Sequence, residues 1–134
     1  MEVGAITLAH LALPTQHVER TAAFFEETLG LERAPLPANS PVDVVWLGVG
    51  GGQTVHVFYV EGFEVSAFEN EFGRHIALYA PDRDLPALKA RLADRGAKVF
   101  DPLRPTSYPR FFFREPINGY VVEVIADRAA RSPA

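Results

Sequence analysis

Hydrophobic residues in this chain recur at two spacings, which alternate along the sequence. Short apolar or β-branched runs typical of strands occupy residues 6–13, 31–36, 42–49, 54–60, 73–80, 97–100, 110–114 and 120–126. Helical spacing joins Val18, Ala22, Phe25 and Leu29, and it joins Leu85, Leu88 and Leu92 again. The pattern predicts a strand, a helix and three strands, followed by the same order once more. We interpret this as an internal structural repeat.

Turn-forming residues separate the expected elements. Thr15 is an expected helix N-cap and Gly30 an expected C-cap. Gly50, Gly51 and Gly52 predict a tight hairpin turn, because no Lys-Ser/Thr pair and no helix follow them as a phosphate-binding loop requires. Residues 61–72 lack periodicity and are expected to form a connecting loop.

The composition is that of a globular chain and excludes several classes of protein. With 134 residues, of which 48% are hydrophobic, one domain with a sizeable core is expected. The formal net charge is −4 and the 13 basic residues are scattered, which argues against nucleic acid as a partner. No apolar run reaches membrane-spanning length, and no signal-peptide layout is present, so a cytoplasmic location is expected. The chain has no cysteine, which excludes disulfides and thiolate catalysis.

Three of the expected strands each carry one residue of a metal-binding type: His10, His75 and Glu123. Alternation places His75 on a largely apolar strand face with Ala77 and Tyr79, where an imidazole needs a partner. Two imidazoles and one carboxylate can hold a first-row divalent ion and leave coordination sites open. The alternative is that the three polar groups are satisfied separately in the core.

Four stretches of the chain carry a resemblance to a known family. They are AHLALPTQHVERTAAFFEETLGLE, VWLGVGGGQTVHVF, GRHIALYAPDRDLPALKARLADRGAKV and RFFFREPINGYVVEVI. In this combination the chain resembles the vicinal oxygen chelate superfamily, which groups glyoxalase I, bleomycin-resistance proteins and extradiol dioxygenases. The resemblance implies an α+β fold in which two βαβββ units form an open, cupped mixed sheet. It implies one glyoxalase-like domain over residues 1–128, with units at about 5–60 and 72–126, and residues 129–134 are expected to be a disordered tail.

The resemblance further implies a divalent metal ion, either Zn, Ni, Mn or Fe(II), held by His10, His75 and Glu123. One departure from the family pattern concerns the turn before the last strand. The usual Asp-Pro-x-Gly-Asn is replaced at residues 115–119 by Glu-Pro-Ile-Asn-Gly, with one extra residue before the glutamate. A slip of one residue would turn Glu123 to the opposite face of the sheet. A longer turn that absorbs the extra residue keeps Glu123 as a ligand, and this is our expectation.

His56 is the candidate for proton transfer, and it forms the expected catalytic set together with Glu123. It shares a strand face with Thr54, Phe58 and Val60. Its position is similar to that of the glutamate that glyoxalase I uses as ligand and base. An unperturbed imidazole titrates at about 6.5 and can serve as a base near neutrality. A fourth metal ligand and a polar group bonded in the pocket wall are the alternatives.

Five further residues are weaker candidates for a substrate pocket: Trp46, Phe58, Tyr79, Arg110 and Phe112. Aromatic residues at strand spacing are also typical of plain core. The guanidinium of Arg110 could bind a substrate carboxylate or phosphate. The alternative, slightly favoured by the sequence, is a surface arginine paired with an acid.

Together these features predict a metal-dependent, glyoxalase-like lyase or isomerase that acts on a small oxygenated molecule. An extradiol-type dioxygenase and a thiol transferase acting on an antibiotic such as fosfomycin would use the same three ligands. A non-catalytic protein that sequesters an apolar drug, as bleomycin-resistance proteins do, is the alternative outside catalysis. Proteins resembling this one usually pair, so a homodimer is expected.

Overall fold

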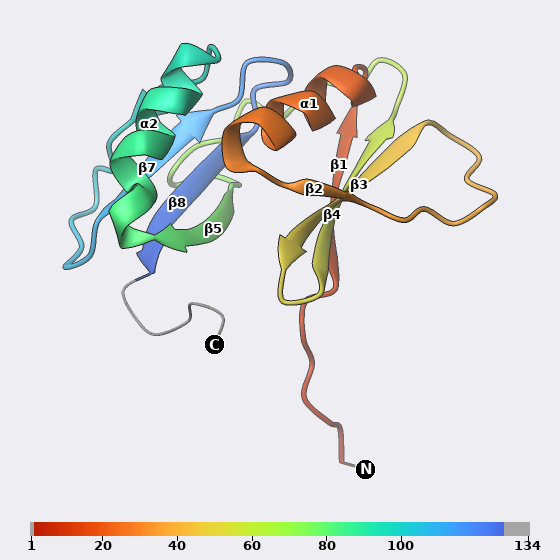
Figure 1. Cartoon of the computed structure of the whole chain (residues 1–134), viewed down its shortest axis with the longest axis horizontal. Coiled ribbons are helices and arrows are strands. Elements are labelled where there is room, and N and C mark those ends of the chain that lie inside the picture. Colours follow the sequence, from red (N-terminus) through yellow and green to blue (C-terminus); the bar gives the residue numbers. More distant parts are fainter. Residues whose placement is uncertain (1, 128–134) are drawn as a thin grey trace. The chain divides into compact units, whose positions relative to one another are not determined.

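The chain is described by a computed structural model that covers residues 2–127 (Figure 1). It divides into two compact units, Met1–Phe63 and Glu64–Ala134, and each unit has its own four-stranded sheet. The expected disordered tail at residues 129–134 lies outside the described part of the chain.

The first unit contains one helix and four strands in the predicted order. They are β1 (His10–Thr15), α1 (Val18–Leu29), β2 (Glu32–Ala34), β3 (Val44–Gly50) and β4 (Gln53–Tyr59). The sheet order is β1-β4-β3-β2, with β1 parallel to β4 and the other pairs antiparallel. Buried and half-buried positions alternate along β3 and β4, and α1 packs on these two strands. Alternation therefore leaves the second face of this sheet for other contacts.

The second unit repeats this topology. It contains β5 (Ile76–Pro81), a short 3-10 turn η1 (Asp82–Asp84), α2 (Leu85–Asp94), β6 (Lys98–Phe100), β7 (Arg110–Arg114) and β8 (Val121–Asp127). The sheet order is β5-β8-β7-β6, and β5 is again parallel to its neighbour β8. The α+β class and the two βαβββ units are thus confirmed.

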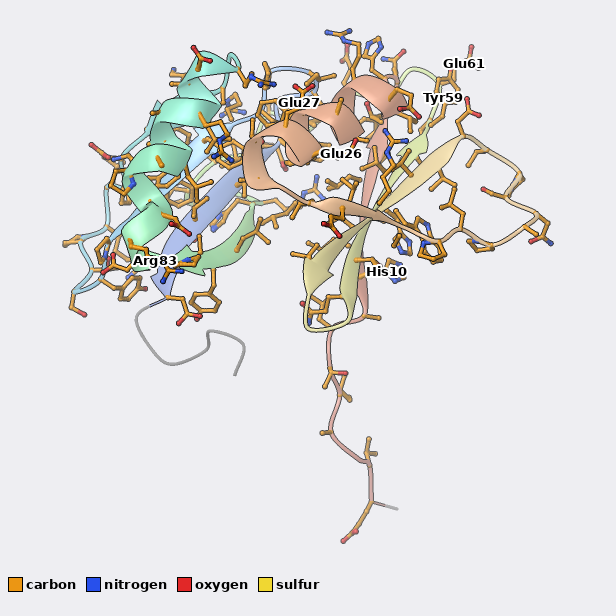
Figure 2. The ribbon with its side chains drawn as sticks, viewed as in Figure 1. His10, Glu26, Glu27, Tyr59, Glu61 and Arg83 are labelled. Carbon is orange, nitrogen blue, oxygen red and sulfur yellow. The ribbon has the colours of Figure 1, made fainter. Side chains whose placement is uncertain are left out.

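Glycines end the first helix and close the first hairpin as expected. Gly30 follows α1 with a left-handed backbone (φ 71°) and its N–H bonds to the Glu26 carbonyl. Gly50, Gly51 and Gly52 all have positive φ angles, which joins β3 to β4 by a tight turn. Arg33 of β2 bonds to Glu26 of α1, which Figure 2 labels beside that helix.

The expectation that Thr15 caps α1 is wrong. His17 occupies the N-cap position, and no side chain caps the helix. The Thr15 hydroxyl is buried and accepts a hydrogen bond from the His17 N–H at 2.9 Å. Thr15 therefore shapes the approach to the helix from two residues before the N-cap.

The first strand begins later than the hydrophobic pattern predicts. Its expected start at Ile6 is wrong, because β1 begins at His10, and Ile6 and Leu8 are 89% and 56% exposed. The neighbouring strand β4 begins only at Gln53, whose side-chain amide donates to the Leu8 carbonyl at 3.2 Å. The Thr54 N–H bonds to the Ala9 carbonyl at 3.3 Å, and the chain before Leu8 extends past the end of the sheet (Figure 1).

His75 precedes β5 instead of lying within it, so its predicted mid-strand place is also wrong. The chain before it folds back, and the Arg74 N–H bonds to the Phe68 carbonyl at 3.0 Å. At Gly73 a Cβ atom would collide with that same carbonyl, so the close approach needs glycine. Because of this fold-back, β5 begins at Ile76, and His75 lies directly before the strand.

Candidate functional site

His75 and Glu123 meet in the second unit. The His75 Nε2 lies 3.1 Å from Glu123 Oε1, and the His75 Nδ1 lies 3.1 Å from the Asn70 carbonyl oxygen. In the sheet, Glu123 of β8 is flanked by Ala77 of β5 and by Phe112 of β7. These pairs put Glu123 on the face on which the His75 side chain also lies.

The hydrogen-bond partners of His75 indicate which groups can occupy the space between the His75 ring and the Glu123 carboxylate. A carbonyl oxygen only accepts, so the ring donates from Nδ1 to Asn70. Arg110 donates to one oxygen of the Glu123 carboxylate at 3.0 Å, and the other oxygen lies 3.1 Å from His75 Nε2. The space between Nε2 and that oxygen can hold either a ring proton, which the carboxylate accepts, or a metal cation bound by both groups. A hydrogen bond that fixes the far nitrogen is the usual setting of a metal-binding histidine.

The turn at residues 115–119 absorbs the extra residue that put Glu123 in doubt. The Glu115 carboxylate is buried and accepts hydrogen bonds from the backbone N–H groups of Ile117, Asn118 and Tyr120. The Glu115 N–H also bonds to the Tyr120 carbonyl, which closes the turn before β8 begins. These hydrogen bonds all lie within the turn. The register of β8 is therefore set by its neighbours β5 and β7.

Arg110 is buried, so the slightly favoured surface placement is wrong. Its side chain is 2% exposed and lies between two carboxylates, Glu123 at 3.0 Å and Glu71 at 3.4 Å. The same guanidinium donates to the Arg104 carbonyl. Its Nε is buried without a hydrogen-bond partner among the described residues. Arg110 therefore holds one oxygen of Glu123, and its pairing with an acid is as expected although the pair is buried.

Glu71 belongs to this network but was not identified from the sequence. It lies in the segment 61–72, which carries no periodic signal, and its carboxylate accepts from the N–H groups of Leu103 and Arg104 at 2.7 and 3.1 Å. Burial alone raises the pKa of the Glu71 carboxyl. The two backbone hydrogen bonds and the nearby Arg110 charge outweigh that effect, so its pKa lies below 4.5.

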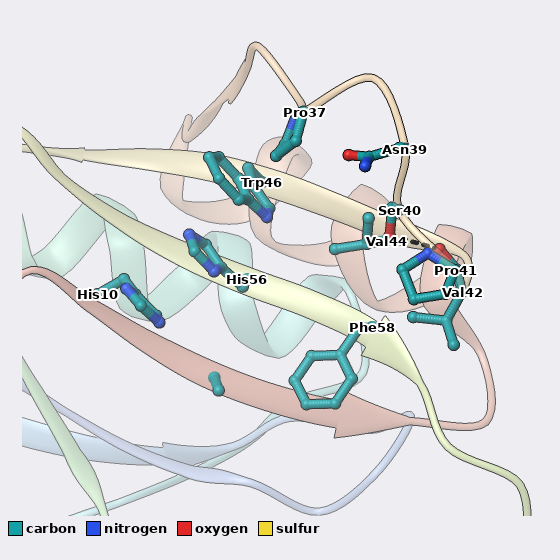
Figure 3. Close-up of a pocket in the computed structure, with 11 residues that line it drawn as sticks. His10, Pro37, Asn39, Ser40, Pro41, Val42, Val44, Trp46, His56 and Phe58 are labelled. Carbon is teal, nitrogen blue, oxygen red and sulfur yellow. Dashed lines mark hydrogen bonds between the residues drawn. The ribbon is translucent and has the colours of Figure 1, made fainter.

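In the first unit, His10, His56 and Trp46 form a stack of rings (Figure 3). The His56 ring lies 4.0 Å from the His10 ring on one side and 4.0 Å from the Trp46 ring on the other, nearly parallel to both. The His56 Nε2 lies 2.9 Å from the Thr54 hydroxyl. Burial lowers the pKa of His56 below 6.5, and the neighbouring His10 lowers it further.

The stack forms one wall of a pocket of about 440 Å³. The pocket lies on the sheet face opposite α1, and the segment before β3 covers its other side (Figure 3). It is lined by His10, Ala12, Pro37, Asn39, Ser40, Pro41, Val42, Val44, Trp46, His56 and Phe58. A volume of this size is typical of small-molecule sites.

The remaining candidates are distributed differently. Tyr79 is 57% exposed on β5, whereas Phe112 is fully buried. The Phe112 ring packs edge-on against His75, with centroids 5.2 Å apart, and supports that side chain.

His10 belongs to the first unit, and His75 and Glu123 belong to the second. Within either unit, residues 2–127 contain no group of three or more His, Asp or Glu side chains arranged for a metal.

The βαβββ topology occurs twice, and histidines and a glutamate lie on or beside its strands. These features define a class of proteins built from paired βαβββ units. The sequence model of the Glyoxalase/Bleomycin resistance protein/Dioxygenase superfamily matches residues 7–124, and the chain belongs to this superfamily. A search of curated proteins found no match. No helix in the described part of the chain is long and apolar enough to cross a membrane.

Several solved structures have the same fold. A protein from Bacillus anthracis described as glyoxalase-family is 22% identical, with a TM-score of 0.77 over 96% of this chain and 100% of that one. The fosfomycin resistance protein FosX from Listeria monocytogenes is 16% identical, with a TM-score of 0.72 over 94% of each chain. A mutant of the Listeria FosX, solved with Mn(II) and 1S,2S-dihydroxypropylphosphonic acid, is 13% identical, with a TM-score of 0.68 over 96% of each chain. These similarities concern the fold.

Proposed function

We propose that this protein is a metal-dependent enzyme of the superfamily in which His10, His75 and Glu123 hold one divalent cation. Its reaction is a glyoxalase-like elimination or isomerisation of a small oxygenated molecule. The observation that supports the proposal is the 3.1 Å approach of His75 Nε2 to Glu123 Oε1, with the far ring nitrogen of His75 held by the Asn70 carbonyl. The Mn(II) complex of a FosX protein with the same fold adds support for the kind of cofactor.

The donor set suits zinc, nickel, manganese or iron(II), because two imidazoles and one carboxylate are acceptable to each of them. When bound, such an ion supplies Lewis acidity that stabilises negative charge on a substrate oxygen. Arg110 holds one oxygen of Glu123 and leaves the other directed at His75. The protein thus presents Glu123 to the ion through a single oxygen.

His56 is better placed for proton transfer than for a fourth ligand position. Lone pairs of an imidazole lie in the ring plane, and the His10 and His56 planes differ by only 12° at 4.0 Å. Two rings stacked in this way direct their lone pairs side by side and not toward one shared atom. In the tautomer whose Nε2 donates to the Thr54 hydroxyl, the Nδ1 of His56 can accept a proton from a substrate carbon.

Metal analysis of the purified protein tests the proposal. We expect about one equivalent of divalent metal per chain in the wild type, and its loss in His10→Ala, His75→Ala and Glu123→Gln. His17 is exposed at the start of α1, so His17→Ala is the matched control and keeps the metal. Unchanged metal content in the three ligand variants would refute the proposal.

The structural likeness to FosX proteins makes a reaction on fosfomycin the second candidate. Turnover of fosfomycin by the metal-loaded protein, with water or with a thiol, distinguishes this candidate from the first. Turnover of a catechol after anaerobic loading with iron(II) would instead identify an extradiol-type dioxygenase.

A further inference from the structure

Stability alone does not explain why Arg110 is buried between two carboxylates. Its terminal nitrogens bond to Glu123 Oε2 at 3.0 Å and to Glu71 Oε2 at 3.4 Å, and all three side chains are buried. Buried ion networks of this kind add little net stability compared with apolar side chains of similar volume. The Arg110 Nε, which has no hydrogen-bond partner among the described residues, lowers that stability further. A role in holding the Glu123 carboxylate accounts for the arrangement better.

The Arg110 guanidinium is itself held from the loop at residues 103–104. The N–H groups of Leu103 and Arg104 donate to the two oxygens of Glu71 at 2.7 and 3.1 Å. The Arg104 carbonyl accepts from the same guanidinium nitrogen that bonds to Glu71. One short loop therefore fixes both Glu71 and Arg110.

The guanidinium in turn restricts how Glu123 can bind a cation. Arg110 occupies Oε2 of Glu123, while Oε1 lies 3.1 Å from His75 Nε2. The Phe112 ring lies against both neighbours, with its centroid 5.5 Å from the Arg110 guanidinium carbon and 5.2 Å from the His75 ring centroid. Glu123 cannot turn both oxygens to a cation shared with His75 unless its bond to Arg110 breaks.

The charge of Glu71 matters to the same carboxylate. A cation held by Glu123 shares that group with the positive guanidinium of Arg110, and the two positive charges repel each other. Glu71 gives the guanidinium a second negative partner, and solvent screens buried charges only weakly. Glu71 therefore lowers the electrostatic cost of binding a cation next to Arg110.

We propose that Arg110 and Glu71 are positioning residues for the metal ligand Glu123. Arg110 restricts Glu123 to one coordinating oxygen, and Glu71 offsets the Arg110 charge so that the cation binds more tightly. The inference rests on the proposed function, because Glu123 belongs to the suggested metal set. It adds two residues that act through Glu123 and are not themselves ligands.

Titration of the metal-free protein with Co(II) tests the role of Glu71. The ligand-field absorption of Co(II) reports its affinity and the arrangement of its donors in one measurement. Glu71→Gln keeps an oxygen that accepts from the backbone but removes the charge that faces Arg110. We expect its Kd for Co(II) to rise by about 10-fold, with the spectrum of the bound ion unchanged because Arg110 still holds Glu123. An unchanged Kd would overturn the role of Glu71.

Glu115→Gln is the matched control, because it makes the same exchange at another buried carboxylate of the second unit. Glu115 accepts hydrogen bonds from the backbone N–H groups of its own turn. We expect this variant to unfold at lower urea but to bind Co(II) with the affinity of the wild type. Equal weakening of Co(II) binding in both variants would overturn the inference, because lost stability or lost net charge would then explain the effect.

The double variant Arg110→Met/Glu71→Gln tests the restriction on Glu123. It removes one charge of each sign, so the net charge of the network is kept and Glu71 is not left buried beside an uncharged side chain. With Oε2 of Glu123 released, we expect the Co(II) spectrum to differ in shape and intensity from that of the wild type and of Glu71→Gln. A spectrum that superimposes on both would overturn the role of Arg110.

These titrations separate failure of the inference from failure of the proposed function. A wild type that binds no Co(II) loses the proposed function and the inference with it. A wild type that binds Co(II) through His10, His75 and Glu123, with a Glu71→Gln variant that binds it equally well, keeps the proposed function and loses the inference.

Discussion

The charge of Arg110 is neutralised inside the second unit by Glu123 and Glu71. Each carboxylate is held by further groups: Glu71 by two backbone N–H groups, and Glu123 by His75. This chain of contacts joins the loop at residues 103–104 to the proposed metal ligands. The charged side chains in this network hold one another in place. Removal of one of them leaves another charge buried and unpaired.

Replacing Arg110 should therefore cost much more stability than replacing an exposed arginine. For Arg110→Met we expect the free energy of unfolding to fall by about 3–5 kcal/mol, because two carboxylates lose a buried partner. Arg33 also bridges two glutamates, Glu19 and Glu26, but its side chain is 43% exposed, and Arg33→Met should cost less than about 1 kcal/mol. Urea denaturation of both variants makes the comparison. Equal losses would contradict the buried network.

The lowered pKa of Glu71 makes stability depend on pH. A carboxyl group whose folded pKa lies below 4.5 stabilises the fold above that value, because the unfolded chain takes up the proton first. The contribution is lost as the pH falls from 4.5 through the folded pKa. Urea denaturation from about pH 6 to about pH 3 should show this loss in the wild type and a smaller one in Glu71→Gln. The exposed Glu64→Gln serves as control and should follow the wild type; a Glu71→Gln profile that also follows it would contradict the assignment.

At the scale of elements, the turn at residues 115–119 closes before β8 begins and leaves the register of that strand to its neighbours. Three backbone N–H groups converge on the Glu115 carboxylate, and the turn is closed before the strand begins. The register of β8 then follows from β5 and β7 on either side. This arrangement places Glu123 opposite Ala77 and Phe112, beside His75.

Removing the Glu115 carboxylate should destabilise this turn and the strand after it. For Glu115→Ala we expect a loss of about 3 kcal/mol, since buried N–H groups are left without an acceptor. Glu115→Gln keeps one acceptor oxygen and should lose about half as much. Urea denaturation measures both variants. A loss below about 1 kcal/mol in Glu115→Ala would show that the carboxylate is dispensable.

The observed first residues of β1 and β5 differ from those that the hydrophobic pattern predicts. Residues 6–9 have the composition of a strand, but β4 begins at Gln53, and its first residues meet just the Leu8 and Ala9 carbonyls of that run. His75 continues the alternation of β5, but the bond from Arg74 to Phe68 turns the chain away before Ile76. Strand propensity is expressed only where a neighbouring strand supplies hydrogen bonds.

At the scale of the whole molecule, the proposed metal set draws one ligand from the first unit and two from the second. A cation that binds the folded chain and not the unfolded one raises the free energy of unfolding. The expected homodimer and the single domain over residues 1–128 remain predictions.

Metal removal should therefore lower the stability of the whole chain. At a free metal concentration of about 100 times Kd, the metal adds about 2.7 kcal/mol to the free energy of unfolding. Chelation with EDTA should remove this increment and lower Tm in the wild type and in His17→Ala. The variants His10→Ala and His75→Ala should unfold alike with and without EDTA. An equal response to EDTA in all four proteins would contradict a shared site.

The sequence alone determined the order of elements, the two-unit repeat, the turn at Gly50–Gly52, and the residue types able to bind a metal. These follow from hydrophobic periodicity and backbone conformational preference, which are local properties. The tertiary structure decided that Arg110 is buried, that Glu71 joins it, and that His56 lies between His10 and Trp46. Such contacts join residues distant in sequence, and their energies depend on burial and on partners that no local pattern specifies.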